Sequence, residues 1–140
     1  MISATVALET RFYDLDPMSV VWHGNYARFL EVARSALLTK IGYDYLEMKA
    51  SGFAWPIVEM KIKYVRALRF PRRFTATATL EEYENRIRIG YLLRGEDGKV
   101  LTRAGTTQVA VSIVTGELSL VSPPELIEKV KACLSADASA

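Results

Sequence analysis

The sequence is poor in the residues that build disulfides and metal centres. Its 140 residues include one cysteine, Cys133, and one histidine, His23. A single cysteine excludes an internal disulfide and any multi-cysteine zinc site, and one histidine with scattered acids gives little support for a catalytic metal. We therefore expect no bound metal. We also expect a cytoplasmic location, because chains without disulfides are typical of reducing compartments.

Long hydrophobic runs, a strong charge of one sign and phosphate-binding loops are also missing. No apolar run reaches the roughly 18–20 residues that a membrane-spanning helix needs, so we expect no membrane span. The net charge of +2 is too weak to indicate a nucleic-acid partner. Neither Gly-x-x-x-x-Gly-Lys nor Gly-x-Gly-x-x-Gly occurs, so nothing supports a nucleotide cofactor, and we expect no cofactor.

The composition is that of one folded domain. Half of the residues are hydrophobic and 24% are charged, a mixture that can bury a core. A length of 140 residues is typical of one domain. We therefore predict a single domain over residues 1–140, in which the small and polar segment 135–140 frays as a tail.

The hydrophobic periodicity predicts a strand, then a long helix, then a sheet. Residues 5–13 alternate as in a half-buried strand, and from Tyr26 the spacing becomes helical. Asn25 is the expected N-cap of this helix and Gly42 its expected C-terminal end. Alternation returns in residues 55–65, 74–82, 87–93 and 100–114, and an amphipathic helix follows from Pro123. One long helix packed on hairpin-linked, antiparallel strands predicts an α+β domain of two layers.

Candidate catalytic groups gather in one stretch, around the loop before the long helix. They are Asp14, Asp16, His23, Asn25 and Glu31. A carboxylate beside a helix N-terminus can hydrolyse an ester or a thioester, because the unpaired N–H groups at that end polarise a carbonyl that the carboxylate or an activated water attacks. The same residue types also build turns and helix caps, so the residues alone leave both interpretations open.

The segment from Arg11 to Arg34, RFYDLDPMSVVWHGNYARFLEVAR, resembles the signature of the 4-hydroxybenzoyl-CoA thioesterase family. This family includes the acyl-CoA thioesterases associated with the Tol–Pal system. A looser similarity continues to about Pro123. The resemblance implies a hotdog fold, in which a curved antiparallel sheet of about five to six strands wraps one long helix. It also implies a homodimer or homotetramer with active sites at the subunit interface.

The resemblance also assigns roles to individual residues. Asp16 corresponds to the catalytic aspartate, which acts as nucleophile or general base. The backbone N–H of His23 or Gly24 corresponds to the group that polarises the thioester carbonyl. The His23 side chain corresponds to a histidine that positions substrate or water in some members, and Asn25 to a residue that supports the loop and caps the helix.

Residues outside the motif are candidates for substrate binding. Trp22, Phe53, Trp55 and Tyr64 are large aromatic residues that could line a pocket for an acyl or aryl group. Coenzyme A carries phosphates, so its binding surface should be basic, and we assign Arg86 and Arg88 to it.

The motif departs from the family pattern at three positions. Met18 and Ser19 stand where many relatives have smaller residues, and Phe12 stands where some have a tyrosine. Serine reaches a positive φ less readily than glycine, so the loop is expected to take a different conformation.

The first hypothesis is an acyl-CoA thioesterase that releases a free acid and CoA. One alternative, which the departures favour, is a protein that binds acyl groups without hydrolysing them. Another is a thioesterase that acts on acyl carrier protein, whose acidic surface would suit the basic strands.

Overall fold

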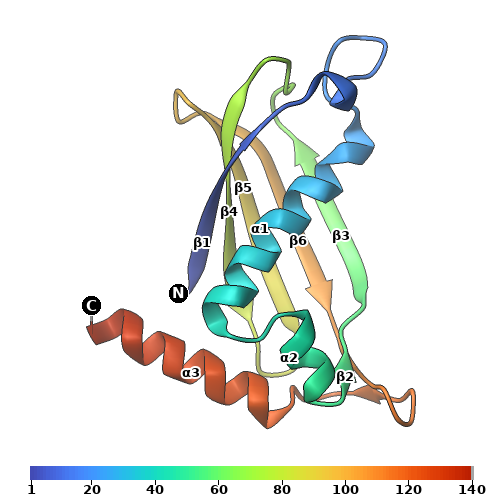
Figure 1. Cartoon of the computed structure of the whole chain (residues 1–140), viewed down its shortest axis with the longest axis vertical. Helices are drawn as coiled ribbons and strands as arrows, with labels where there is room; N and C mark the ends of the chain where they lie inside the picture. Colours follow the sequence, from blue (N-terminus) through green and yellow to red (C-terminus); the bar gives the residue numbers. More distant parts are fainter. Residues whose placement is uncertain (140) are drawn as a thin grey trace.

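The computed structural model describes residues 1–139 and contains one long helix laid across a curved sheet (Figure 1). The helices are α1 (Tyr26–Ile41), α2 (Tyr45–Ala50) and α3 (Pro124–Ser139), and two 3-10 turns, η1 (Phe12–Asp14) and η2 (His23–Asn25), precede α1. The strands are β1 (Ser3–Glu9), β2 (Phe53–Ala54), β3 (Ile57–Tyr64), β4 (Arg73–Glu82), β5 (Ile87–Gly95), β6 (Val100–Gln108), β7 (Ala110–Ser112) and β8 (Leu118–Ser119). The predicted α+β architecture is confirmed.

The main sheet has five antiparallel strands in the order β1-β4-β5-β6-β3, and β2, β7 and β8 form a small second sheet. Residues of β4 and β5 alternate between buried positions and positions that are mostly half-buried, because only one face of the sheet carries the helix. Neither edge strand of the main sheet, β1 or β3, has a further partner among the described residues. The edge strand β3 therefore offers unpaired backbone groups along eight residues.

The core lies between α1 and the sheet. Leu30, Ala33 and Leu37 are spaced by three and four residues, so they share one helix face, and all three are fully buried. Two small residues of β4, Ala76 and Ala78, are also fully buried and let the helix approach the sheet closely. At its C-terminal end, Gly42 has a φ of 88° and donates its N–H to the carbonyl of Leu38, as the sequence predicts.

Several predicted boundaries differ in the structure. Asn25 occupies the predicted N-cap position of α1, but it has helical dihedrals and its side chain makes none of the expected capping hydrogen bonds. The predicted strand 100–114 is interrupted at Val109, whose N–H leaves the ladder and bonds to the carbonyl of Pro56. Helix α3 continues over 135–139, where the composition predicts a frayed tail, and Ala140 lies outside the described residues.

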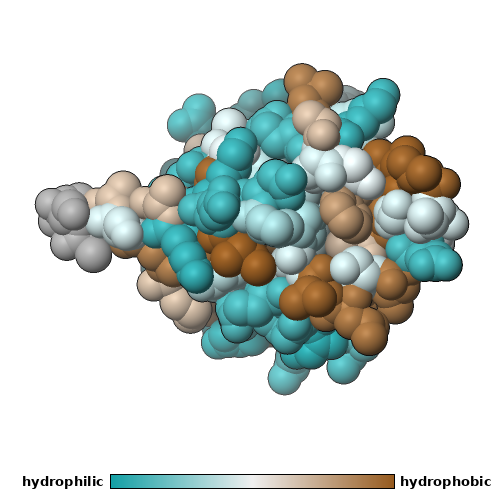
Figure 2. Space-filling model, turned by 90° about the horizontal axis from the view of Figure 1, so that it is seen from below, coloured by the Kyte–Doolittle hydropathy of each residue, from teal (hydrophilic) through white to brown (hydrophobic). Residues whose placement is uncertain are grey.

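Hydrophobic side chains gather at one end of the molecule. Figure 2 shows the molecule from below, with the end of α3 projecting on the left and most hydrophobic side chains on the right. This is the side on which β2 and the β7–β8 turn lie in Figure 1. The exposed apolar residues of this region are Leu46, Ile113, Val114, Leu118, Leu120 and Val121. An apolar surface of this kind is typical of a face that contacts another molecule.

Candidate active site

The loop before α1 is a short hairpin whose second arm runs directly into the helix. Leu15 and Val21 form a bridge between the two arms. The N–H of Asp16 donates to the carbonyl of Val20 at 2.8 Å, and that of Trp22 donates to the carbonyl of Asp14 at 2.9 Å. Val21 is buried and anchors the hairpin in the core. The loop is therefore a hydrogen-bonded element rather than a free connection.

Asp16 uses one carboxylate oxygen to hold this hairpin. Its Oδ1 accepts the N–H of Met18 at 2.8 Å and that of Val20 at 3.4 Å. Its Oδ2 accepts no hydrogen bond from the described residues. The side chain is partly buried, so the free oxygen lies at the protein surface with its partner oxygen fixed.

Ser19 completes the turn in the left-handed conformation. Its φ is 63°, and its N–H donates to the carbonyl of Asp16 at 3.0 Å. Serine thus takes the positive φ that glycine adopts more readily, and the Asp16 hydrogen bonds stabilise the turn in this conformation.

The 3-10 turn η2, which leads directly into α1 and is here called the helix tip, carries unpaired donors. The Asn25 N–H bonds to the carbonyl of Trp22 at 2.9 Å, and the Tyr26 N–H bonds to that of His23. The N–H groups of His23 and Gly24 have no acceptor in the part of the chain that the structure describes. Such groups at a helix N-terminus attract a partial negative charge.

The indole of Trp22 lies directly against Gly24. A Cβ built on Gly24 would come within 2.3 Å of the Trp22 ring, and this ring stands 5.2 Å from the imidazole of His23. Both side chains are exposed. Glycine is therefore required at position 24 for the indole to cover the helix tip.

Replacing Gly24 with alanine should separate activity from stability. The new methyl group displaces the indole, which is half exposed and can swing into solvent, so the free energy of unfolding should change by less than about 1 kcal/mol. Catalytic efficiency on a thioester should fall about 10-fold, because the displaced ring no longer covers the helix tip. Urea denaturation and steady-state kinetics measure the two effects. Gly105→Ala, where a Cβ finds only an ordinary contact at 3.7 Å, serves as control. Unchanged kinetics would contradict the role of the Trp22 contact.

Tyr64 supports the helix tip from β3. Its hydroxyl donates to the carbonyl of His23 at 3.1 Å, and its ring packs edge-on against Tyr26 at 4.8 Å. Burial raises the pKa of the Tyr26 hydroxyl, which also makes a hydrogen bond with the Leu68 backbone. The structure thus places Tyr64, a predicted pocket residue, beside the predicted oxyanion donors.

Asp14 and Asn25 stabilise the loop through an ion pair and hydrogen bonds, and we assign neither of them a catalytic role. The Asp14 carboxylate is buried, pairs with the guanidinium of Arg28 and accepts the N–H of Arg11 at 2.8 Å. The side-chain amide of Asn25 donates to the carbonyl of Asp14 at 2.8 Å. Asn25 therefore supports the loop, as the resemblance implies, although it does not cap the helix.

The two arginines assigned to coenzyme A lie at the other end of the sheet. Arg86 precedes β5 and pairs with Glu82 at 3.0 Å, and Arg88 is exposed on β5. The Asp16 hairpin lies near the opposite end, where β4 begins. At about 3.3 Å per residue, β4 separates these ends by roughly 30 Å, so one protomer does not bring the arginines to Asp16.

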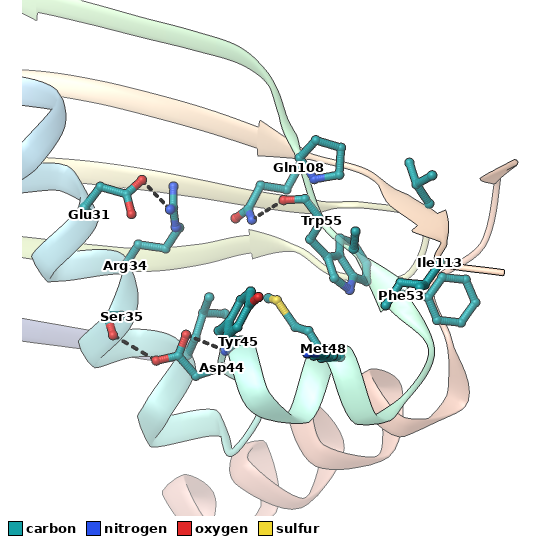
Figure 3. A pocket seen from close by; sticks show the side chains of 15 residues that line it. Glu31, Arg34, Ser35, Asp44, Tyr45, Met48, Phe53, Trp55, Gln108 and Ile113 are labelled. Atoms are coloured by element: carbon teal, nitrogen blue, oxygen red, sulfur yellow. Dashed lines mark hydrogen bonds and ion pairs between the residues drawn. The ribbon is translucent and has the colours of Figure 1, made fainter. Parts of the chain in front are cut away.

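A pocket of about 600 Å³ opens between α1, α2 and the small sheet (Figure 3). Of the four aromatic candidates, Phe53 and Trp55 line this pocket, whereas Trp22 and Tyr64 lie outside its lining. The wall from α1 and α2 contains Glu31, Arg34, Ser35, Leu38, Asp44, Tyr45, Met48 and Lys49, and the wall from the strands adds Ala54, Pro56, Gln108, Val111 and Ile113. Sequence reasoning missed Gln108, whose only signal is a polar residue at an inward position of a predicted strand.

Residues 1–139 contain neither a candidate metal site nor a candidate membrane-spanning helix. No group of three histidine, cysteine, aspartate or glutamate side chains could hold a metal ion. None of the described helices is both long and apolar enough to cross a membrane.

Residues 10–132 match the family model of the thioesterase-like superfamily. The chain belongs to this superfamily. It is 28% identical over 105 residues to the candidate acyl-CoA thioesterase YneP of Bacillus subtilis, a similarity that spans 74% of this chain and 76% of YneP. A shorter similarity, 35% over 69 residues, covers 49% of this chain and 37% of a chloroplastic acyl-acyl carrier protein thioesterase of Arabidopsis thaliana.

Solved structures of thioesterases share the fold of this superfamily member. DHNA-CoA thioesterase from Staphylococcus aureus superimposes with a TM-score of 0.85 at 25% identity, over 99% of this chain and 95% of the other. The predicted hotdog fold and the predicted kinship with thioesterases are therefore confirmed.

Proposed function

We propose that this protein is a thioester hydrolase that converts an acyl-CoA into a free acid and CoA. The observation that carries the proposal is that one loop presents two complementary features. Asp16 has a carboxylate oxygen without a hydrogen bond, and the helix tip has two unpaired N–H groups. Membership of the thioesterase-like superfamily and the names of its relatives support it. No cofactor takes part, because coenzyme A belongs to the substrate.

Strand geometry supports a short distance between the Asp16 carboxylate and the N–H groups of His23 and Gly24. Asp16 lies opposite Val20 in the hairpin, and Trp22 is two residues further along the same arm. Residues related in this way share one face, with Cα atoms about 7–8 Å apart. Trp22 immediately precedes the unpaired N–H groups of His23 and Gly24, so a small planar group fits between carboxylate and helix tip.

The proposed chemistry follows from this placement. The thioester oxygen accepts hydrogen bonds from the N–H groups of His23 and Gly24, which stabilise the negative charge that grows on it during attack. In one route, Asp16 Oδ2 attacks the carbonyl carbon, CoA leaves as a thiolate that takes a proton from solvent, and water hydrolyses the mixed anhydride. In the other route, Asp16 takes a proton from a water molecule that attacks directly and passes this proton to the departing thiolate.

The structure of the loop favours hydrolysis over binding without turnover. The departures at Met18, Ser19 and Phe12 favour a non-hydrolytic protein, and Phe12 is exposed. Met18 and Ser19 are the two that adjoin Asp16. In the structure these residues form an ordered turn whose N–H groups hold Asp16 in place. An intact carboxylate on a fixed turn supports a working site.

A panel of acyl-CoA thioesters, read by release of free thiol, tests the proposal. Hydrolysis of at least one acyl-CoA above the buffer rate is the expected result. Tight binding of acyl-CoA with no thiol released would instead favour the non-hydrolytic alternative. Because part of the chain resembles an acyl-acyl carrier protein thioesterase, each acyl group should also be presented on acyl carrier protein. Faster turnover on the protein carrier would identify that carrier as the substrate.

We also propose that copies of the chain associate as a homodimer or homotetramer in the cytoplasm. The unpaired edge of β3, with Val58 and Met60 exposed on it, supports association through this strand. The single cysteine suits a reducing compartment. Sedimentation equilibrium should give a mass of at least twice 15.7 kDa.

A further inference from the structure

We infer, on the basis of the proposed function, that Gln108 and Arg34 form a polar end to the pocket of Figure 3 and select acyl groups that carry a hydroxyl at their distal end. Both residues line the pocket, and each has a buried polar atom without a partner in the described part of the chain. Buried polar atoms are normally hydrogen-bonded, so an unpaired donor and an unpaired acceptor at one pocket point to a ligand that satisfies both.

Gln108 presents an acceptor whose orientation is fixed. The residue is 4% exposed and lies at the end of β6, opposite Ile57 of β3 and Ile87 of β5. Its Nε2 donates to the carbonyl of Trp55 at 2.9 Å, so the amide cannot be reversed without losing that bond. Its Oε1 is left without a partner, and in Figure 3 the amide extends toward the side where Arg34 and Glu31 enter from α1.

Arg34 presents the complementary donor. Its Nη2 pairs with the carboxylate of Glu31, while its Nη1 is buried without an acceptor. The hydroxyl of Tyr91 lies beside this guanidinium and also makes a hydrogen bond with Thr106 at 2.8 Å. Burial raises the pKa of Tyr91, and the Thr106 bond together with the charge and a hydrogen bond of the Arg34 side chain opposes this shift. The guanidinium therefore faces both Glu31 and Tyr91, and its Nη1, which no acceptor meets with hydrogen-bonding geometry, can add a bond to a ligand.

A hydroxyl suits this pair better than other groups. It can accept from the Arg34 guanidinium and donate to the Gln108 Oε1 at once. A carboxylate would satisfy Arg34 but would direct its own lone pairs at the Gln108 oxygen, and a methyl group would leave both atoms unpaired. The remaining wall is largely apolar, with Leu38, Met48, Phe53 and Trp55 among its residues, and suits a hydrocarbon body.

The pocket lies along one face of α1, the helix that η2 leads into. Glu31, Ser35 and Leu38 are spaced by four and three residues, which places them on one side of this helix. At 1.5 Å per residue, Glu31 lies about 8 Å and Arg34 about 12 Å along the axis from Tyr26, the first residue of α1. An acyl group whose carbonyl is held at the tip can therefore extend along this face toward the polar end.

Gln108→Leu tests the inference with two substrates that differ by one hydroxyl, 8-hydroxyoctanoyl-CoA and octanoyl-CoA. The unmodified protein should prefer the hydroxylated substrate by roughly 10²-fold in kcat/KM, because a site with polar groups rejects an analogue that leaves them unpaired. The variant should lose most of this preference. Arg34→Met should lose it as well, and it keeps the test valid where loss of the Trp55 bond impairs folding. Met48→Leu, a volume-conserving change in the apolar wall, should shift both substrates together.

Binding of the free acids separates this inference from the proposed function. Calorimetry with 8-hydroxyoctanoic and octanoic acids requires no hydrolysis, and tighter binding of the hydroxy acid that disappears in Gln108→Leu supports the polar end even where no thioester is cleaved. Equal kcat/KM for the two thioesters and equal affinity for the two acids would overturn the inference, while leaving hydrolysis itself in place.

Discussion

Replacing Asp16 with asparagine should lower thioester turnover at least about 10²-fold while leaving the fold intact. Asparagine keeps the Oδ1 acceptor that receives the N–H groups of Met18 and Val20, so the turn should persist. It replaces the free carboxylate oxygen with an amide nitrogen, which neither attacks a carbonyl nor takes a proton from water.

The matched control is Asp97→Asn in the β5–β6 hairpin. Asp97 also accepts the N–H of the residue two positions later, Lys99, at 3.0 Å, and this bond lowers the pKa of its carboxyl. Both substitutions change the same atoms in the same kind of turn, but only the one at position 16 should affect catalysis. Thiol release by extensively purified protein measures the rate. An Asp16→Asn preparation as active as the unmodified protein would falsify the assignment of Asp16.

Truncating Arg28 to alanine should lower the free energy of unfolding by about 2–3 kcal/mol. The buried carboxylate of Asp14 would keep the backbone N–H of Arg11 as a donor but would lose its ionic partner. Removing one member of a fully buried pair costs about 3–5 kcal/mol, and we expect less here because the Arg28 side chain is half exposed. Loss of the guanidinium over the Phe29 ring, 5.3 Å from its centroid, adds to the effect.

Urea denaturation of Arg28→Ala beside Lys131→Ala measures this contribution. Lys131 is an exposed helical cation on α3, so its truncation controls for the loss of a positive charge and a long side chain from a helix. Its effect should stay within about 0.5 kcal/mol. Equal stability of the two variants would show that the Asp14–Arg28 pair does not hold the loop.

The sequence predicted the parts of the fold that depend on periodicity and on glycine. The change from alternating to helical spacing at Tyr26 located the start of α1, and Gly42 located its end, because both signals are local to the chain. The antiparallel order of β4, β5 and β6 follows from short connections, of which Asp97-Gly98 is the clearest.

Long-range hydrogen bonds decided what the sequence left open. Asn25 has the right chemistry for a cap, but the carbonyl of Asp14, eleven residues away, takes its amide instead. The break between β6 and β7 arises because the Val109 N–H bonds to Pro56, more than fifty residues earlier. Neither partner can be identified from spacing along the chain.

The candidate site likewise has one part that the sequence predicts and one part that depends on the fold. The motif around Asp16 and the tip of α1 is continuous in sequence, so its residues could be named before the fold was known. The pocket combines α1, α2 and three strands, and the significance of Gln108 depends on an atom left unpaired by its bond to Trp55. Such a feature exists only once the chain has folded.

The Leu15–Val21 bridge has a consequence for the proposed mechanism. It closes residues 15–21 into a hydrogen-bonded loop that carries Asp16, and the Trp22 N–H bond to the carbonyl of Asp14 ties this loop to the segment that enters η2. The carboxylate and the N–H groups of His23 and Gly24 are thus joined through cross-links as well as through the chain, so the proposed reacting groups do not depend on a free connection for their relative placement.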